Sequence, residues 1–271
     1  MMNMKSFDNR PIGVFDSGVG GLTVAKSICA HLPDEDIIYF GDTARVPYGN
    51  KSRATIIRFS HEIMSFLLRK KVKMAVVACN TASSLSLTSL KKTYDIPVVG
   101  VIIPGVREAL RVSGKKRIGV IGTNSTISSG AYDRTVKKMD SSCRLYSMCC
   151  PLFVPLVENR FLNDEITFRV AEKYLKPLKK KNIDTLILGC THYPILKTAI
   201  GRVMKGVKLV DSSSAVAKEV KRILAAGGMA ARRGGRRKGK LRCFVSDDAE
   251  SFRGVSGIFL KKDISVEKAV L

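Results

Sequence analysis

Two cysteines lie in matching frames in the two halves of this sequence. The first stands in MAVVACNT (74–81) and the second in DTLILGCTH (184–192), so that Cys79 and Cys190 are 111 residues apart. Each frame has an apolar run of strand length, a small residue, the cysteine and then small polar residues. If the two halves face each other, both thiols meet across one cleft. Two opposed thiols on a small substrate suggest proton removal at one face and proton delivery at the other, as in a two-base racemase.

The repeat extends beyond the cysteines. IGVFDSG (12–18) is matched by IGVIGTN (118–124), and PVVGV (97–101) is matched by VKLVD (207–211). Three landmarks therefore recur in the same order, at offsets of 106, 111 and roughly 110 residues. This ordered recurrence predicts two similar α/β halves.

Short apolar segments alternate with amphipathic ones along the chain. The clearest helix is predicted at 51–70, where Ile56, Phe59 and Ile63 fall on one stripe. Strands are predicted at 11–15, 37–40, 74–78, 97–101, 117–121, 144–149, 184–188, 207–210 and 241–245. Helices are predicted near 20–31, 51–70, 81–93, 105–113, 126–139, 164–181, 194–204 and 212–226. Such alternation indicates mostly parallel sheets flanked by helices.

Sheets of this kind bind ligands beyond the carboxyl ends of their strands. Cys79, Cys190, Asp16 and Asp211 all stand at that end of a predicted strand. A thiol is a base only as the thiolate, and the pKa of a free cysteine is near ~8.5. Helix N-termini carry unpaired N–H groups and partial positive charge, so they can lower a thiol pKa and hold a carboxylate.

Composition bounds the class of protein. A chain of 271 residues with 45% hydrophobic content can bury a large core. Residues 1–10 have no signal-like apolar core, and no run approaches the ~20 apolar residues of a membrane helix. We therefore expect a cytoplasmic protein without membrane contact, whose seven cysteines are reduced thiols.

Five of the cysteines have an ordinary structural explanation, because free cysteine is a common core residue. They are Cys29, Cys143, Cys149, Cys150 and Cys243. The sequence contains no C-x-x-C pair with metal-ligand spacing, so a zinc site is not predicted.

The formal net charge of +24 is high, and a local excess lies in the Gly/Arg-rich segment 225–240. Its glycines predict a basic loop. Contact with nucleic acid or an acidic membrane is one interpretation of the 227–240 part. The segment has no aromatic residue to stack on bases, which favours a solvated surface loop.

The segment DSGVGG (16–21) follows a strand and opens a helix. It lacks the full G-x-G-x-x-G spacing and a Walker lysine, and its leading acid would repel a phosphate. Asp16 beside a thiol or an amino group fits better, although Asp16 or Ser17 also suits a helix N-cap.

Two further candidates lie in turns. In the loop GDTARVPYGN (41–50), Tyr48 and Gly49 can offer a hydroxyl and a closely approaching backbone, whereas Asp42 can equally pair with Arg45. His192 opens a helix beside Cys190, and we interpret it as a site residue rather than a structural histidine.

Together these motifs resemble those of the glutamate racemases, in the cofactor-independent aspartate/glutamate racemase superfamily. The resemblance covers nearly the whole chain, and the ordered set of motifs is specific where no single motif is. Its carriers are GVFDSGVGGLT (13–23), the loop from Gly41-Asp42 to Tyr48-Gly49, CNTA (79–82), PLFVPLVE (151–158) and GCTHYP (189–194).

The resemblance implies two pseudo-symmetric α/β domains with the active site in the cleft between them. The first domain would take residues 1–104 plus 213–271, and the second 105–212. It also implies interconversion of L- and D-glutamate without pyridoxal phosphate, metal or any other cofactor, supplying D-glutamate for peptidoglycan. The partners expected are this small-molecule substrate and, in a homodimer, a second copy of the chain.

The resemblance further assigns roles to residues. Cys79 and Cys190 would be the paired bases, with Asp16 assisting Cys79, and with Glu158 and His192 assisting Cys190. The substrate contacts it implies are Asp16, Ser17, Tyr48, Gly49, Asn80, Thr81, Thr191 and His192.

Two alternatives remain open at this point. One is a racemase of the same superfamily directed at aspartate, because the sequence does not reveal the size of the cavity. The other is a nucleic-acid-binding protein that uses its basic surface and needs no opposed cysteines. The segment 227–240 is not required by the family pattern and lies outside its motifs.

Overall fold

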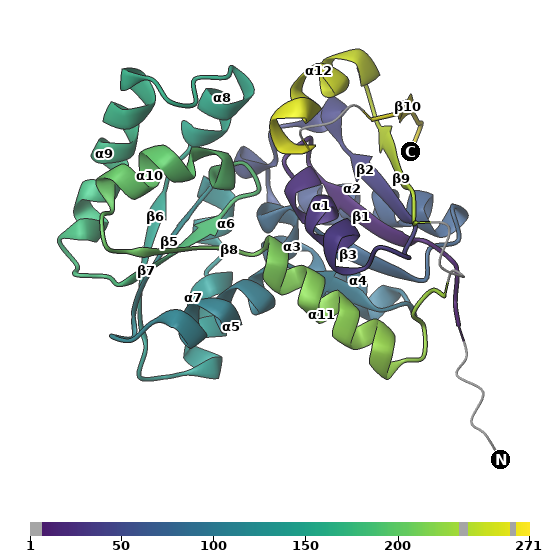
Figure 1. Ribbon diagram of the computed structural model, residues 1–271, viewed down its shortest axis with the longest axis horizontal. Helices are drawn as coiled ribbons and strands as arrows, with labels where there is room; N and C mark the ends of the chain where they lie inside the picture. Colours follow the sequence, from purple (N-terminus) through teal and green to yellow (C-terminus); the bar gives the residue numbers. More distant parts are fainter. Residues whose placement is uncertain (1–6, 233–237, 261–263) are drawn as a thin grey trace.

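The computed structural model describes residues 7–232, 238–260 and 264–271. Its strands form two sheets, and every strand pairing within them is parallel. Figure 1 shows the sheets in separate halves of the molecule, with helices packed around each. The predicted α/β class, with two halves built on parallel sheets, is therefore confirmed.

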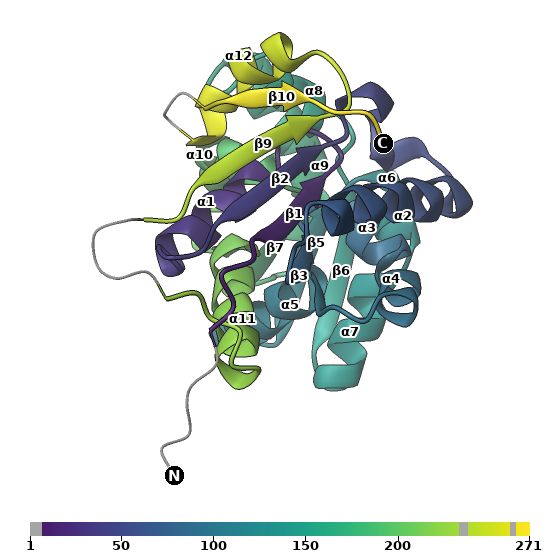
Figure 2. The same ribbon diagram turned by 90° about the vertical axis from the view of Figure 1, so that its right-hand side faces the viewer.

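The first sheet has the strand order β10-β9-β2-β1-β3-β4, which Figure 2 shows from β10 to β3. The second has the order β6-β5-β7-β8. The first contains β1 (Ile12–Asp16), β2 (Ile37–Gly41), β3 (Met74–Val77), β4 (Val98–Gly100), β9 (Leu241–Val245) and β10 (Val266–Lys268). The second contains β5 (Arg117–Gly122), β6 (Arg144–Cys149), β7 (Thr185–Gly189) and β8 (Lys208–Asp211). The order β2-β1-β3-β4 is thus repeated as β6-β5-β7-β8, as the sequence repeat predicts.

Helices connect the strands. The α-helices are α1 (Leu22–His31), α2 (Arg53–Arg69), α3 (Asn80–Leu85), α4 (Leu87–Thr93), α5 (Ile102–Val112), α6 (Asn124–Ser128), α7 (Ala131–Met139), α8 (Phe153–Glu158), α9 (Glu165–Lys179), α10 (Lys197–Val203), α11 (Ser213–Ala226) and α12 (Ala249–Leu260). Short 3₁₀ turns span Thr43–Arg45, Tyr48–Asn50 and Tyr193–Leu196.

Some predicted helices are wrong in extent. The helix expected at 81–93 is divided at Ser86, whose hydroxyl donates to the Ala82 carbonyl. The helix expected at 126–139 is divided by Gly130, whose φ of 63° is a left-handed conformation that glycine adopts readily. The helix expected at 194–204 begins with a 3₁₀ turn.

Other elements were not predicted. Helix α8 is six residues long and contains Pro155, α12 contains Gly254 and Gly257, and β10 has only three residues. Short length and helix-breaking residues remove the periodic signal on which sequence prediction depends. Part of the basic loop, residues 233–237, lies outside the described residues.

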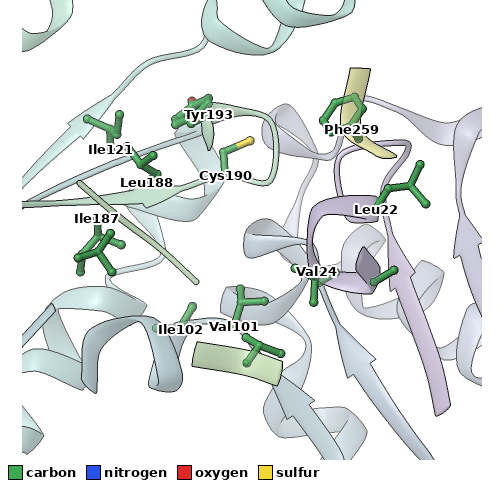
Figure 3. Close-up of a cluster of buried hydrophobic side chains, with 14 of the residues drawn as sticks. Leu22, Val24, Val101, Ile102, Ile121, Ile187, Leu188, Cys190, Tyr193 and Phe259 are labelled. Atoms are coloured by element: carbon green, nitrogen blue, oxygen red, sulfur yellow. The ribbon is translucent and has the colours of Figure 1, made fainter. Parts of the chain in front are cut away.

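Alternate residues of the first sheet face opposite sides, as strand geometry requires. Val14 and Val76 belong to an apolar cluster that continues into β5 and β7 of the second half, whereas Phe15 and Val77 belong to a separate cluster under α2. Figure 3 shows the shared cluster, in which Leu22 and Val24 of α1 lie across from Leu188 and Cys190. Because one apolar cluster spans both halves, the sheets are held together by core packing.

A buried ion pair holds chain segments at the amino ends of the strands in the first sheet. The side chains of Lys73 and Glu35 are 0% and 2% exposed, and Lys73 Nζ lies 2.6 Å from Glu35 Oε2. The contact is an ion pair, but its geometry does not meet the requirements of a hydrogen bond. Lys73 Nζ also donates to the carbonyls of Asp8 and Met229, and Glu35 Oε1 accepts from the Ala231 amide.

We expect Lys73→Met to destabilise the protein by about 3–5 kcal/mol, because the buried Glu35 carboxylate would lose its counter-charge. Urea denaturation at pH 7 measures the change. Arg169→Met is the matched control, since its pair with Glu165 is exposed and worth less than about 1 kcal/mol. Equal losses in both variants would contradict a structural role for the buried pair.

Candidate active site

The carboxyl ends of β1, β3, β5 and β7 open onto one cavity of about 220 Å³. Cys79 follows β3 and Cys190 follows β7, and both buried thiols belong to residues that line it. The lining residues are Ser17, Val46, Pro47, Tyr48, Gly49, Asn50, Cys79, Asn80, Thr81, Thr123, Asn124, Pro151, Val154, Pro155, Glu158, Gly189, Cys190, Thr191 and His192. Every predicted site residue except Asp16 is in this set.

Asp16 is fully buried and does not line the cavity, although the neighbouring Ser17 and its partner Thr191 do. Its carboxylate accepts from the Gly18 amide at 3.1 Å and from Thr191 Oγ1 at 3.4 Å. Burial raises the pKa of Asp16, and the charge of His192 opposes that rise. The Thr191 bond connects this carboxylate to the second half of the molecule.

Cys79 is the N-cap of α3, and its sulfur accepts from the Ala82 amide at 3.5 Å and donates to Ser17 Oγ at 3.7 Å. Burial, followed by the charge of Asp16, raises the pKa of Cys79 to about 12. The expectation that the helix N-terminus lowers the thiol pKa is therefore wrong for Cys79. Desolvation and a neighbouring carboxylate outweigh the helix amides. At neutral pH Cys79 is a protonated thiol.

The surroundings of Cys190 are different. His192 Nδ1 lies 3.9 Å from Cys190 Sγ, and His192 Nε2 lies 3.0 Å from Glu158 Oε1. Burial by itself lowers the pKa of His192, but the hydrogen bonds to Cys190 and Glu158 and their charges raise it to about 10. The Phe259 ring, on α12, makes a T-shaped contact with the imidazole, with 5.6 Å between ring centres. A protonated imidazole in this position stabilises negative charge on the Cys190 sulfur.

The glycine-rich turn after β1 brings the two halves together. A side-chain carbon at Gly20 would lie 2.6 Å from His192 Nδ1 and even closer to Thr191 Oγ1. Only glycine leaves room for that approach. The motif 16–21 therefore serves close packing against the second cysteine segment, in agreement with the argument against a phosphate loop.

Tyr48 is buried, and its hydroxyl donates to the Asp42 carboxylate. The same carboxylate accepts from Arg45 Nε at 2.7 Å and from Ser246 Oγ at 2.8 Å. The structural alternative for Asp42 is thus confirmed. The Tyr48 hydroxyl that was expected to meet a ligand is already bonded to Asp42, and the loop backbone at Tyr48-Gly49 lines the cavity.

Sequence analysis missed several lining residues, among them Thr123. Its hydroxyl forms a triangle with the hydroxyls of Thr81, which was predicted, and of Thr126, which is outside the cavity lining. The oxygen separations are 3.0 Å for Thr81 and Thr123, 3.1 Å for Thr81 and Thr126, and 3.0 Å for Thr123 and Thr126. Thr123 follows β5 at the position that Ser17 occupies after β1, so the internal repeat carried a signal for it. Pro151, Val154 and Pro155 lie on or beside α8, which gave no sequence signal as a helix.

Asp211 also stands at a strand end but does not join this cavity. Its carboxylate binds Lys197 Nζ and the amide and hydroxyl of Ser213. Of the cysteines interpreted as core residues, Cys150 and Cys243 are buried, whereas Cys29, Cys143 and Cys149 are only half-buried.

Within the described residues, no group of three or more His, Cys, Asp or Glu side chains is arranged to hold a metal ion. None of the helices described has the length and apolar character that crossing a membrane requires.

Comparison with known proteins gives one consistent result. The family described as Asp/Glu/hydantoin racemase matches residues 21–220. A glutamate racemase from Geobacter metallireducens is 49% identical over 252 residues, which are 93% of this chain and 93% of that protein. The crystal structure of a glutamate racemase isoform from Bacillus anthracis has a TM-score of 0.93 at 40% identity, covering 97% of this chain and 98% of that one. The Francisella tularensis glutamate racemase, solved with D-glutamate, has a TM-score of 0.88 at 41% identity, with coverages of 97% and 98%.

The pKa of His192 predicts a pH dependence of stability. A histidine pKa near ~6.5 in the unfolded chain rises to about 10 in the folded protein. The proton therefore stabilises the fold fully below about pH 6.5, and this contribution is lost as pH rises through about 10. We expect the difference in urea midpoint between the parental protein and His192→Asn to shrink from pH 6.5 to pH 10. A constant difference over that range would contradict the raised pKa.

Proposed function

The chain belongs to the Asp/Glu/hydantoin racemase family, and we propose that it interconverts L- and D-glutamate by two-base proton transfer between Cys79 and Cys190. It is thus an isomerase. The observation that carries the mechanism is the single cavity of about 220 Å³ onto which both buried thiol residues open. The relatives named as glutamate racemases favour glutamate over aspartate as the substrate.

The two sulfurs have different surroundings. This difference supports the proposal that one acts first as the base and the other as the acid. Cys79, with a pKa of about 12, holds its proton, whereas the Cys190 sulfur lies 3.9 Å from Nδ1 of His192, whose pKa is raised to about 10. In one direction the Cys190 thiolate removes the Cα proton from one face of the amino acid. The Cys79 thiol then delivers its own proton to the opposite face of the planar carbanion. One C–H bond breaks and one forms, so the proton count is unchanged.

The reverse direction needs the opposite protonation pattern. Cys79 must then be the thiolate and Cys190 the thiol. We propose that Asp16 assists proton exchange at Cys79, and that Glu158 and His192 assist it at Cys190. The polar groups of Ser17, Asn80, Thr81 and Thr191 would hold the substrate, because they line or adjoin the space between the two sulfurs.

The remaining expectations stay part of this proposal. We infer that the reaction needs no cofactor and that its D-glutamate supplies peptidoglycan synthesis in the cytoplasm. The domain limits 1–104 plus 213–271 and 105–212, homodimer formation, and a solvated surface loop at 227–240 remain predictions, with nucleic-acid contact of that segment as the alternative interpretation.

Racemisation by purified protein, dialysed against a chelator, tests the function. We expect D-glutamate to form from L-glutamate without added pyridoxal phosphate or metal, faster than D-aspartate forms from L-aspartate. Cys79→Ala and Cys190→Ala should each lose at least about 10²–10⁴-fold in kcat, the usual contribution of a general acid or base. Cys243→Ala, which changes a buried thiol outside the cavity lining, is the matched control. Near-parental turnover in either cavity variant would exclude the two-cysteine mechanism.

Isotope exchange separates the two bases. In heavy water we expect deuterium at Cα of the product from the first turnover, while recovered substrate stays largely protiated, because the abstracted proton remains on the opposite thiol. Asp16→Asn should change the isotope effect for steps at Cys79, and His192→Asn that for steps at Cys190. The equilibrium constant between enantiomers must stay at one in every variant. Deuterium entering recovered substrate as fast as product forms would indicate a single exchanging base.

A further inference from the structure

Asn80 is connected across the two halves of the molecule by one buried hydrogen bond. The Tyr132 hydroxyl, on α7 of the second half, donates to Asn80 Oδ1 at 2.7 Å. Asn80 is the first residue of α3 in the first half and follows Cys79 directly. The two side chains are buried, with residue exposures of 1% for Tyr132 and 5% for Asn80. This bond therefore forms only when the two halves are packed as they are here.

The bond determines which end of the amide faces the cavity. An asparagine amide has an acceptor oxygen and a donor NH₂ group, so fixing one end fixes the other. Because Oδ1 is held by Tyr132, Nδ2 is left as a donor, and within the described residues it donates to no protein atom. Asn80 itself lines the cavity between the thiols. A donor at this position suits a carboxylate of an amino-acid substrate.

Tyr132 is suited to this task by its environment. Burial raises the pKa of its phenol, so the neutral O–H donor persists across the working range of pH. Gly130, at φ 63°, is the N-cap of α7, and Tyr132 is the second residue of that helix. Its ring packs against Gly189. If position 189 carried a Cβ atom, that atom would lie 3.3 Å from Tyr132 Cε2. Tyr132 is not among the residues that line the cavity, so any effect on the substrate must pass through another residue.

We propose that Tyr132 is a positioning residue, which holds the Asn80 amide with Nδ2 directed at the substrate carboxylate. This inference rests on the proposed racemase function and adds a residue that neither the motifs nor the cavity lining identify. It also links substrate binding to the packing of the two halves, because donor and acceptor come from opposite sides of the interface. Removing the hydroxyl would leave Oδ1 buried without a donor and free the amide to turn its oxygen toward the carboxylate.

The test is Tyr132→Phe, which removes only the hydroxyl. We expect KM for both glutamate enantiomers to rise about ten-fold with kcat changed less than about three-fold, because the interaction is made equally in ground and transition states. A purely structural role would instead lower the active fraction and kcat and leave KM unchanged. Tyr94→Phe is the control and should keep the parental KM. It removes the hydroxyl of a half-buried tyrosine, which donates to the His61 carbonyl and does not line the cavity.

A double-mutant cycle shows whether Tyr132 acts through Asn80. In an Asn80→Ala background, Tyr132→Phe should change KM by less than about two-fold, because the amide that it positions is gone. Two results would overturn the proposal. One is a parental KM in Tyr132→Phe. The other is a further rise in KM of about ten-fold when Tyr132→Phe is added to Asn80→Ala.

Calorimetric titration with D-glutamate separates this inference from the function on which it rests. The dissociation constant should show the same dependence on Tyr132 and Asn80 without any turnover. A parental protein that binds D-glutamate but does not racemise it would overturn the proposed function while the coupling could still be measured. A parental protein that does not bind glutamate would overturn both.

Discussion

The parallel pairing of β1 with β3, and of β5 with β7, decides where the chemical groups of this protein lie. Phe15 pairs with Val77 in the first sheet, and Ile121 pairs with Leu188 in the second. Each cysteine stands two residues beyond its paired strand residue, and Ser17 and Thr123 stand two residues beyond the strand residues Phe15 and Ile121. The same register therefore puts Ser17 next to Cys79 and supplies Thr123 at the corresponding place in the second half. Parallel strands end together, so both sets of groups meet at one cavity.

The two halves share a topology but differ in their charged groups. Asp16 ends β1, whereas the corresponding end of β5 is Gly122, and His192 occupies the place after Cys190 that Thr81 occupies after Cys79. Burial and the carboxylate of Asp16 raise the pKa of Cys79, whereas the imidazole of His192, whose own pKa is raised to about 10, lies 3.9 Å from the Cys190 sulfur. A fully symmetric pair of sites would have no such difference. The divergence of the repeat therefore matters as much to the proposed chemistry as its preservation.

The cavity depends on contacts that cross between the halves. Thr191 bonds Asp16, Tyr132 bonds Asn80, and the glycine at position 20 leaves space for His192 and Thr191. These polar contacts sit beside an apolar cluster that runs from α1 to β7, so core packing holds them at short range. Small displacements between the halves would lengthen several of these bonds together. The site is thus a property of the interface and not of either sheet alone.

The sequence by itself determined the α/β class, the division into two similar halves, and the placement of Cys79 and Cys190 at strand ends. These follow from local apolar runs and short-range turns, whose signals lie within a few residues. Glu158 was identified as a site residue only through the resemblance to the racemase family, and not from a pattern of residues. Only the tertiary structure decided that Tyr132 meets Asn80 and that Thr123 joins Thr81, and it reversed the pKa shift expected for Cys79. Those outcomes depend on burial and on charges brought together from distant segments, which no local pattern of residues encodes.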